Sequence, residues 1–314
     1  MLSALIFSIG ITAPVLLVMM LGYLARHRGW VDGHFVTQGS TMVFNVGLPS
    51  VLFLKTSHMD FAAITGAFDV IVVGALATVG AILVMWKVSP LIAPAQHQRG
   101  VFVQAAYRSN MGIMGLATVM NMYGDIALPI AAIYLSLITI LYNVCAVAVL
   151  SLSNQSALEL KPVFKHIALN PLIHSLLLGI IASALKVELP AIIVVSLEYL
   201  SDMVLPLALI CIGAKLDLIR LLRPSLIVFI GSAAKLLFTP LLALVLGKLA
   251  ALEPMELGVL FLMASAPSAS ASFAMAKQFG GDAELAADMI AVTTIFATIT
   301  TAFGVFVLTL IGWV

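Results

Sequence analysis

The sequence predicts an all-α integral membrane protein of ten transmembrane helices, which form two inverted five-helix repeats. Three observations lead to this prediction. Hydrophobic residues make up 62% of the 314 residues and charged residues only 9%, whereas soluble domains contain far more charge. The apolar runs continue for about twenty residues, as spanning helices need, and do not alternate like the strands of a membrane barrel. The two halves of the chain also match each other at a fixed offset.

The match between the halves lies at an offset of 157 residues. Glycine falls on glycine, or proline on proline, at five positions, against about one expected from composition. The matched positions are Pro14 and Pro171, Gly22 and Gly179, Leu48-Pro49 and Leu205-Pro206, Gly74 and Gly231, and Gly124-Asp125 and Gly281-Asp282. Because each repeat is predicted to hold an odd number of spans, the second repeat must lie upside down relative to the first.

Each predicted span is an apolar run bounded by polar or turn-forming residues. The first repeat, residues 1–152, holds spans at 3–25, 36–55, 66–89, 100–121 and 126–152. A polar cytoplasmic hinge loop follows at 153–165. The second repeat, residues 166–314, holds spans at 168–185, 190–213, 224–249, 257–277 and 284–312.

Lys and Arg residues predict the orientation of these spans. With the N-terminus outside, the inner connections hold ten of them and the outer connections three. The inner residues are Arg26, Arg28, Lys87, Arg99, Lys161, Lys165, Lys215, Arg220, Arg223 and Lys277, and the outer ones are Lys55, Lys186 and Lys248. This bias predicts a multi-pass protein of the cell inner (plasma) membrane with both termini on the extracytoplasmic side.

Two spans contain residues that break a helix. The fourth carries Arg108, Asn110, Gly112 and Gly115, and the ninth carries a proline and four serines, namely Ser265, Pro267, Ser268, Ser270 and Ser272. The 157-residue offset places Asn110 on Pro267. We expect both spans to unwind there and to point positive helix ends into a polar cavity, a suitable site for a carboxylate. The alternative is a small-residue packing seam, with serines bonded to their own helix.

Arg108 lies near the centre of its span, where a charge costs at least a few kcal/mol unless it has a partner or water. One interpretation is a bidentate bond to a substrate carboxylate, and the other is a structural pair with a protein acid or with backbone carbonyls. Tyr142 and Asn143 of the fifth span, with Thr300 opposite Asn143 in the repeat, are expected to line the same cavity. Taken singly, such groups are typical of interhelical hydrogen bonds.

A second polar group involves spans two, seven and eight. Asn45 falls on Asp202 at the repeat offset, each four residues before a proline, and Lys235 lies within span eight. Asn45 is a candidate substrate contact. Asp202 and Lys235 either form an intramembrane ion pair, or one of them carries a proton during turnover. A further alternative for Asp202 is a position close enough to the outer surface to be solvated.

Other classes of function find little support. The net charge is +1 without a basic run, so nucleic acid is not an expected partner. Hydrolase, metalloprotease and phosphate-loop motifs are absent, which predicts a protein that is not an enzyme. The six histidines show no metal-ligand spacing, so no metal site is expected.

Four stretches, at 43–53, 108–125, 205–214 and 264–282, resemble the auxin efflux carrier family, whose bacterial members include malate and malonate permeases. The resemblance covers essentially the whole chain. It implies the fold of plant PIN auxin exporters and, more remotely, of bile acid/sodium symporters. In that fold spans 1, 2, 6 and 7 form a scaffold, spans 3–5 and 8–10 form a transport domain, and the fourth and ninth helices cross at their breaks. PIN proteins have proline at both crossings, whereas Asn110-Met-Gly112 stands in the fourth span here, so we expect a softer break there.

The resemblance further implies a secondary carrier of small organic anions, either malate- or malonate-like dicarboxylates or auxin-like monocarboxylates, with an elevator-like mechanism. Two alternatives remain, a sodium-coupled organic anion symporter of the bile-acid type and a transporter-like membrane sensor. The expected partners are the organic anion, the lipid bilayer and a second copy of the chain, docked through the scaffold as a homodimer. No cofactor is expected beyond H⁺ or Na⁺ as coupling ion.

Overall fold

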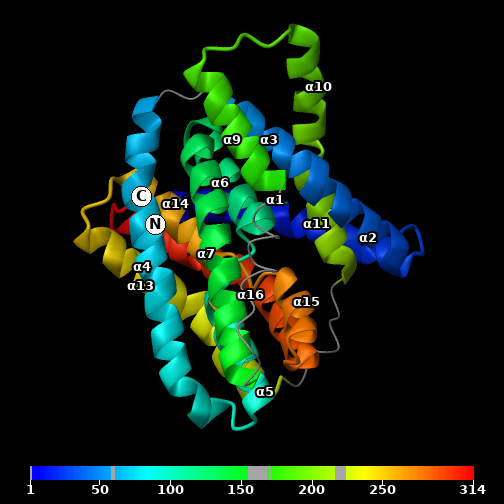
Figure 1. Cartoon of the computed structure of the whole chain (residues 1–314), viewed down its shortest axis with the longest axis vertical. Helices are drawn as coiled ribbons and strands as arrows, with labels where there is room; N and C mark the ends of the chain where they lie inside the picture. The colour runs from blue at the N-terminus through cyan, green and yellow to red at the C-terminus, as the bar shows by residue number, and fades with distance from the viewer. Residues whose placement is uncertain (1, 58–60, 155–168, 170, 216–223) are drawn as a thin grey trace.

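A computed structural model describes residues 2–57, 61–154, 169, 171–215 and 224–314 of the chain (Figure 1). Within these ranges every regular element is a helix, and the only β-type pairing is one isolated bridge. The prediction of an all-α protein is therefore confirmed. The predicted hinge lies almost entirely outside the described residues.

The elements follow the predicted spans closely. In the first half they are α1 (Leu2–His27), α2 (Gly33–Met42), η1 (Val43–Gly47), α3 (Leu48–Ser57), α4 (Phe61–Ile92), α5 (Gln96–Tyr107), η2 (Met111–Gly115), α6 (Leu116–Tyr123), η3 (Gly124–Ala127) and α7 (Leu128–Asn154). In the second half they are α9 (Pro171–Ala184), α10 (Ala191–Asp202), α11 (Val204–Lys215), α12 (Leu226–Ala233), η5 (Ala234–Phe238), α13 (Thr239–Leu249), α14 (Pro254–Ser265), α15 (Ala271–Gln278) and α16 (Ala283–Leu310).

By length and hydropathy, six helical stretches of the described residues are able to cross a membrane. They are Gly10–His27, Ala67–Ile92, Met111–Asn154, Ala191–Lys215, Leu226–Leu249 and Ala283–Leu310. Two shorter helices, α9 and α14, are also apolar. These stretches and the composition identify an integral, multi-pass membrane protein.

Two short π-helical turns precede prolines. Pro49 has no N–H to donate to the Asn45 carbonyl, and Pro240 has none for Leu236. The turns η1 and η5 are centred on these two carbonyls. A π turn widens the helix locally and changes the direction of the side chains that follow. In η5 this turn contains Lys235.

Two helix pairs approach closely through glycines that correspond at the repeat offset. A Cβ atom on Gly22 of α1 would lie 2.2 Å from the Ile210 carbonyl oxygen of α11. A Cβ atom on Gly179 of α9 would lie 3.0 Å from the Phe53 carbonyl oxygen of α3. Gly22 and Gly179 are 157 residues apart, as are Phe53 and Ile210. The same contact is thus made twice with the roles of the two halves exchanged.

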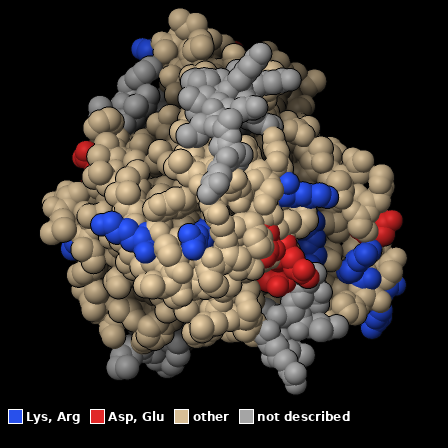
Figure 2. All heavy atoms as spheres, turned by 60° about the horizontal axis from the view of Figure 1, so that its bottom comes forward, with Lys and Arg blue, Asp and Glu red and all other residues tan. Residues whose placement is uncertain are grey.

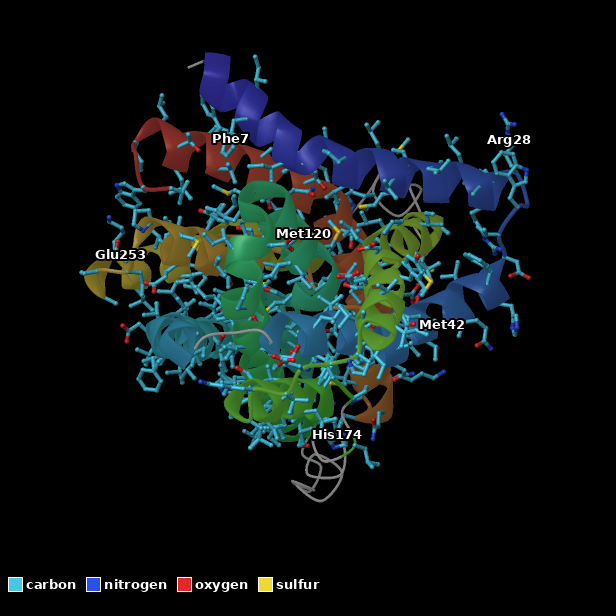
Figure 3. All side chains as sticks on the ribbon, turned by 90° about the horizontal axis from the view of Figure 1, so that it is seen from above. Phe7, Arg28, Met42, Met120, His174 and Glu253 are labelled. Atoms are coloured by element: carbon cyan, nitrogen blue, oxygen red, sulfur yellow. The ribbon has the colours of Figure 1, made fainter. Side chains whose placement is uncertain are left out.

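Figure 1 shows where several connections between the helices lie. In Figure 1 the ends of the chain and the turn between α13 and α14 lie at the left. The connections from α1 to α2 and from α4 to α5 lie at the right and at the bottom. Figure 3 shows α1 running along one side of the molecule from Phe7 to Arg28, with Glu253 near the opposite end from Arg28. The helix α1 packs on both α11 and α16.

Charged side chains are rare and mostly exposed. Figure 2 shows small patches of Lys, Arg, Asp and Glu on one face, most of which carries none of these residues. Among the Lys, Arg, Asp and Glu side chains that the structure describes, only Arg108 and Lys235 are buried. Both contact the breaks in the crossing helices.

Candidate substrate site at the helix crossing

The breaks of spans four and nine meet and pair through their backbones. Helix α5 ends at Tyr107 and α14 at Ser265, and the extended segments that follow form an antiparallel bridge between Ser109 and Ser268. The Asn110 amide donates to the Pro267 carbonyl at 2.7 Å, and the Ala269 amide donates to the Arg108 carbonyl at 2.9 Å. This pairing satisfies backbone groups that unwinding would otherwise leave exposed to lipid.

The break in span four is complete although it lacks proline. Arg108 is extended, with φ −80° and ψ 103°, and Asn110 has φ −79° and ψ 63°. The expectation of a softer break was therefore wrong. Backbone pairing with the ninth span replaces the missing helical hydrogen bonds, so a proline is not needed to keep the helix open.

Hydroxyl groups satisfy the last carbonyls of the broken helices. Ser268 Oγ donates to the Ala105 carbonyl at 2.8 Å, and Thr239 Oγ1 donates to that of Ala106 at 2.8 Å. Ser109 Oγ donates to the Ala264 carbonyl at 3.3 Å. The last carbonyls of a helix have no partner within the helix, so these side chains cap both ends inside the protein.

A cavity of about 280 Å³ lies beside the crossing. Both breaks line it, through Arg108 to Ile113 and through Ala269 to Ala271, together with η1, α7 and α11. Its cations are Arg108 and the exposed Lys215, and its lining contains no Asp or Glu. Its neutral polar side chains are Ser40, Ser109, Asn110, Thr139, Tyr142 and Ser270. The charged groups of the lining are therefore all positive, and apolar residues make up much of the rest.

Within this site Arg108 is held by the fifth span. Its Nη1 lies 3.2 Å from the Tyr142 carbonyl oxygen, and its Nη2 lies 2.8 Å from Asn143 Oδ1. Its Nε is buried without a hydrogen-bond partner among the described residues. The protein partner of Arg108 is thus a carbonyl and an amide rather than an acid. Neither partner is an acid, so these two contacts leave the guanidinium charge without a counter-ion.

The other predicted substrate contacts divide into two groups. Gly112, Tyr142, Ser270 and Asn110 line the cavity. Four do not line it: Asn45 is exposed in η1, Pro267 and Ser268 are buried at the crossing, and Asn143 contacts the cavity only through Arg108. Thr300 bonds to carbonyls of its own helix and does not reach Asn143.

Sequence reasoning missed several lining residues. Ser40 lies in α2, Thr139 in α7 and Lys215 at the end of α11. The charge bias alone predicts an inner loop for Lys215. Its position directly after the stretch 205–214, which resembles the auxin efflux carriers, is the sequence signal that indicates a place near the site.

A larger cavity of about 810 Å³ is lined by residues of α3, η2, α6, η3, α7, α10 and α11. Three acids, Asp125, Glu198 and Asp202, are among its lining residues. Met120 of α6, which Figure 3 labels, also lines it. Gly112, Ile113 and Ala208 line both cavities. The start of η2 and one turn of α11 therefore form part of the wall between an acid-lined cavity and a cation-lined one.

The structure does not join Asp202 and Lys235 in an ion pair. Asp202 is exposed at the end of α10, whereas Lys235 is fully buried and donates to the Ala264 carbonyl at 2.6 Å. Of the two interpretations of this pair, the intramembrane ion pair is wrong. Asp202 faces a cavity, and Lys235 lines neither cavity.

Two broken helices that cross beside a polar cavity, within a multi-pass membrane protein, are typical of a membrane transporter. A family model described as "Membrane transport protein" matches residues 7–305, and the chain belongs to this family. The recognition of an auxin efflux carrier family member from the sequence motifs is therefore confirmed.

Similar proteins extend along nearly the whole chain. A Rhizobium meliloti protein named "Putative malonate transporter" is 27% identical over 301 residues, covering 93% of this chain and 92% of its own. A protein of Methanothermobacter thermautotrophicus named "Uncharacterized transporter" is 25% identical and covers 91% of this chain and 93% of its own. A Methanocaldococcus jannaschii protein, also named as an uncharacterized transporter, is 24% identical, with 96% of both chains covered.

Proposed function

We propose that the chain is a secondary active transporter of small organic anions, with the substrate bound beside the crossing of α5–α6 and α14–α15. The observation that carries this proposal is the cavity of about 280 Å³, which holds two cations and no acid. A carboxylate there would accept hydrogen bonds from the Arg108 guanidinium. The first residues of η2 also line this cavity, so the positive end of the helix that begins there would attract the same carboxylate. The name of the Rhizobium relative supports a short dicarboxylate such as malonate as the first compound to test.

The same cavities support alternating access. Under the orientation proposed from the charge bias, Lys215 lies on the cytoplasmic side, so the cation-lined cavity opens to the cytoplasm and the acid-lined cavity opens outside. The wall between them at Gly112, Ile113 and Ala208 is thin. A shift of the crossing helices against α11 would move the bound anion from one cavity to the other.

We further propose that the ten expected spans form two inverted repeats. The exchanged glycine contacts at Gly22 and Gly179 support this, as does the bond between Asn110 and Pro267, which are themselves equivalent positions. Most packing falls either among α1, α2, α3, α9, α10 and α11 or among the remaining helices, which supports a scaffold and a transport domain. A scaffold-mediated homodimer, a plasma-membrane location and extracytoplasmic termini belong to the same proposal.

If transport uses a proton gradient, Asp202 is the better candidate to carry the proton. It is an exposed carboxyl group in the outer cavity, where protons exchange with water, whereas Lys235 reaches no cavity. Asp202→Asn should then preserve exchange of substrate across the membrane but remove the response to an imposed pH gradient.

Uptake by the purified protein in liposomes tests the function. We expect saturable uptake of labelled malonate, inhibited by malate and other short dicarboxylates, with or without stimulation by imposed proton or sodium gradients. Acetate and an indole carboxylate would show whether monocarboxylates compete. Liposomes that contain the Arg108→Ala protein are the matched control. Failure of every carboxylate to enter or compete, in a preparation shown to be folded, would overturn the proposal.

A further inference from the structure

Lys235 is a buried cation outside the proposed substrate site. Its side chain is 0% exposed and lies in the π turn η5. Its Nζ donates to the Ala264 carbonyl oxygen at 2.6 Å. A charge in this position must have a partner, because desolvation is costly in a membrane interior.

No described acid supplies that partner. Every Asp and Glu side chain that the structure places is exposed or only partly buried, and none of them forms an ion pair with Lys235. The hydrogen-bond partner of Lys235 among the described residues is a backbone oxygen instead. Ser232, three residues before Lys235, and Ser265, next to Ala264, have buried hydroxyls without hydrogen-bond partners among the described residues.

Helix geometry explains why a cation is stable here. Ala264 lies in the last turn of α14, where the carbonyls lack helical partners and carry the negative end of the helix dipole. Backbone carbonyls and half-helix C-terminal ends are also the groups that bind coupling metal ions in transporters with broken helices. The ammonium group therefore stands where a small free cation would be expected.

The equivalent end of α5 has no such cation. Thr239, four residues after Lys235, donates to the Ala106 carbonyl at the end of α5. The repeat equivalent of Lys235 is Thr78, which bonds to the Gly74 carbonyl of its own helix at 2.8 Å. One segment, from η5 to the start of α13, thus contacts both broken helices, and it places a charge only at α14.

We propose that the Lys235 ammonium is a tethered monovalent cation that occupies a cation position at the C-terminal end of α14, so that the crossing keeps its shape without a bound metal ion. Lys235 is then a positioning residue that stays charged, rather than a carrier of protons. Removing its side chain should leave a site that a small free cation can fill. The inference concerns the crossing itself and holds for any substrate.

Thermal stability of the purified protein tests this directly. The wild type should have the same melting temperature in sodium chloride and in choline chloride of equal concentration. Lys235→Ala should melt at a lower temperature, and n-propylammonium, which replaces the deleted atoms, should restore most of the loss. 1-Propanol has nearly the same shape without the charge and should restore little. Lys248→Ala, at the exposed end of α13, is the matched control and should respond to neither compound.

Each arm of the experiment has a result that contradicts the proposal. Specific stabilisation of the wild type by sodium would show that a metal ion is still required. Equal rescue by propylammonium and propanol would show that Lys235 only fills space, and unchanged stability of Lys235→Ala would show that the cation is dispensable. If Lys235→Ala does not fold, Lys235→Met, purified with and without propylammonium, replaces it as the test of the charge. The sodium comparison on the wild type then still tests whether a metal ion is required. None of these outcomes depends on substrate, so they are separate from failure of the transport proposal.

Discussion

The two breaks that cross in this protein occupy equivalent positions in the sequence but face different surroundings. The break in span four exposes Arg108 and Asn110 to the cation-lined cavity. The break in span nine directs Ser268 to the Ala105 carbonyl and Pro267 to the Asn110 amide, and only its last residues, Ala269 and Ser270, reach the cavity. Of the two breaks, the fourth span thus supplies more of the cavity lining, and the ninth span mainly bonds to the backbone of the fourth.

This difference shows how a duplicated element can divide two requirements. Unwinding a helix in a membrane leaves backbone groups that must be bonded, and binding an anion requires donors that remain unbonded. Here small hydroxyls from both breaks, Ser268 and Ser109, donate to carbonyls of the other broken helix. The larger polar side chains that line the cavity, Arg108 and Asn110, come from the fourth span alone.

The largest contrast is expected between Arg108 and its repeat equivalent, Ser265. Arg108→Ala removes a charge-assisted pair of donors and should weaken carboxylate binding roughly 10- to 100-fold. It also leaves Asn143 Oδ1 without its donor and the Tyr142 carbonyl with only the 3.5 Å bond from the Tyr107 hydroxyl, which should lower the free energy of unfolding by about 1–3 kcal/mol. Ser265→Ala removes a hydroxyl that has no hydrogen-bond partner and should change either quantity little. Malonate-dependent shifts in melting temperature measure both effects.

Arg108→Lys refines this comparison. An ammonium group keeps the charge but cannot donate in two parallel directions, so binding should recover only in part. Wild-type binding by Arg108→Ala would show that Arg108 is purely structural. Loss of binding in Ser265→Ala, with Arg108 intact, would contradict the division between the two breaks.

A smaller contrast is expected within the ninth-span break, between Ser268 and Ser270. Ser268→Ala leaves the buried Ala105 carbonyl without its donor and should lower the free energy of unfolding by about 1–3 kcal/mol. Ser270 is exposed to the cavity, so Ser270→Ala should leave stability unchanged and weaken binding by about two- to tenfold. Chemical denaturation and ligand titration of both variants separate these effects. The reverse pattern would place Ser268, not Ser270, against the substrate.

The positions of the helices and of their breaks could be predicted from the sequence for definite physical reasons. A span needs a long apolar run, and Arg108, Gly112 or Pro267 in such a run disrupts either its solvation or its hydrogen bonding. The repeat offset made the two breaks equivalent, and the family resemblance implied that they cross. Each of these inferences depends on local composition or on spacing along the chain.

The direction of individual side chains could not be predicted in this way. Ser268 and Ser270 are two residues apart and chemically identical, yet one bonds to backbone and the other faces the cavity. Opposite charge was the only reason to pair Asp202 with Lys235. In the structure a carbonyl at a helix end bonds to Lys235, which avoids the cost of removing a carboxylate from water. Such outcomes depend on the carbonyls of other helices, which the sequence of one span does not contain.

The smallest effect should distinguish the two turns that follow the breaks, at Asp125 and Asp282. Burial raises the pKa of the Asp282 carboxyl group, but hydrogen bonds from the Leu285 amide and Gln98, with His97 nearby, outweigh burial and lower the pKa below its usual 3.8. A lowered pKa in the folded state means that the carboxylate stabilises the fold above pH 3.8 and that this stabilisation is lost as the pH falls through the folded value.

Asp282→Asn keeps a side chain able to cap α16, so it isolates the charge. Because the group is partly exposed and screened by water, we expect a loss of about 0.5 kcal/mol or less at neutral pH. That difference from the wild type should vanish when thermal unfolding is measured at a pH below the pKa of Asp282 in the folded protein. Asp125→Asn is the control, because it removes one negative charge at the equivalent turn. A difference that persists in strong acid would mean that packing of the amide, rather than the charge, accounts for the effect.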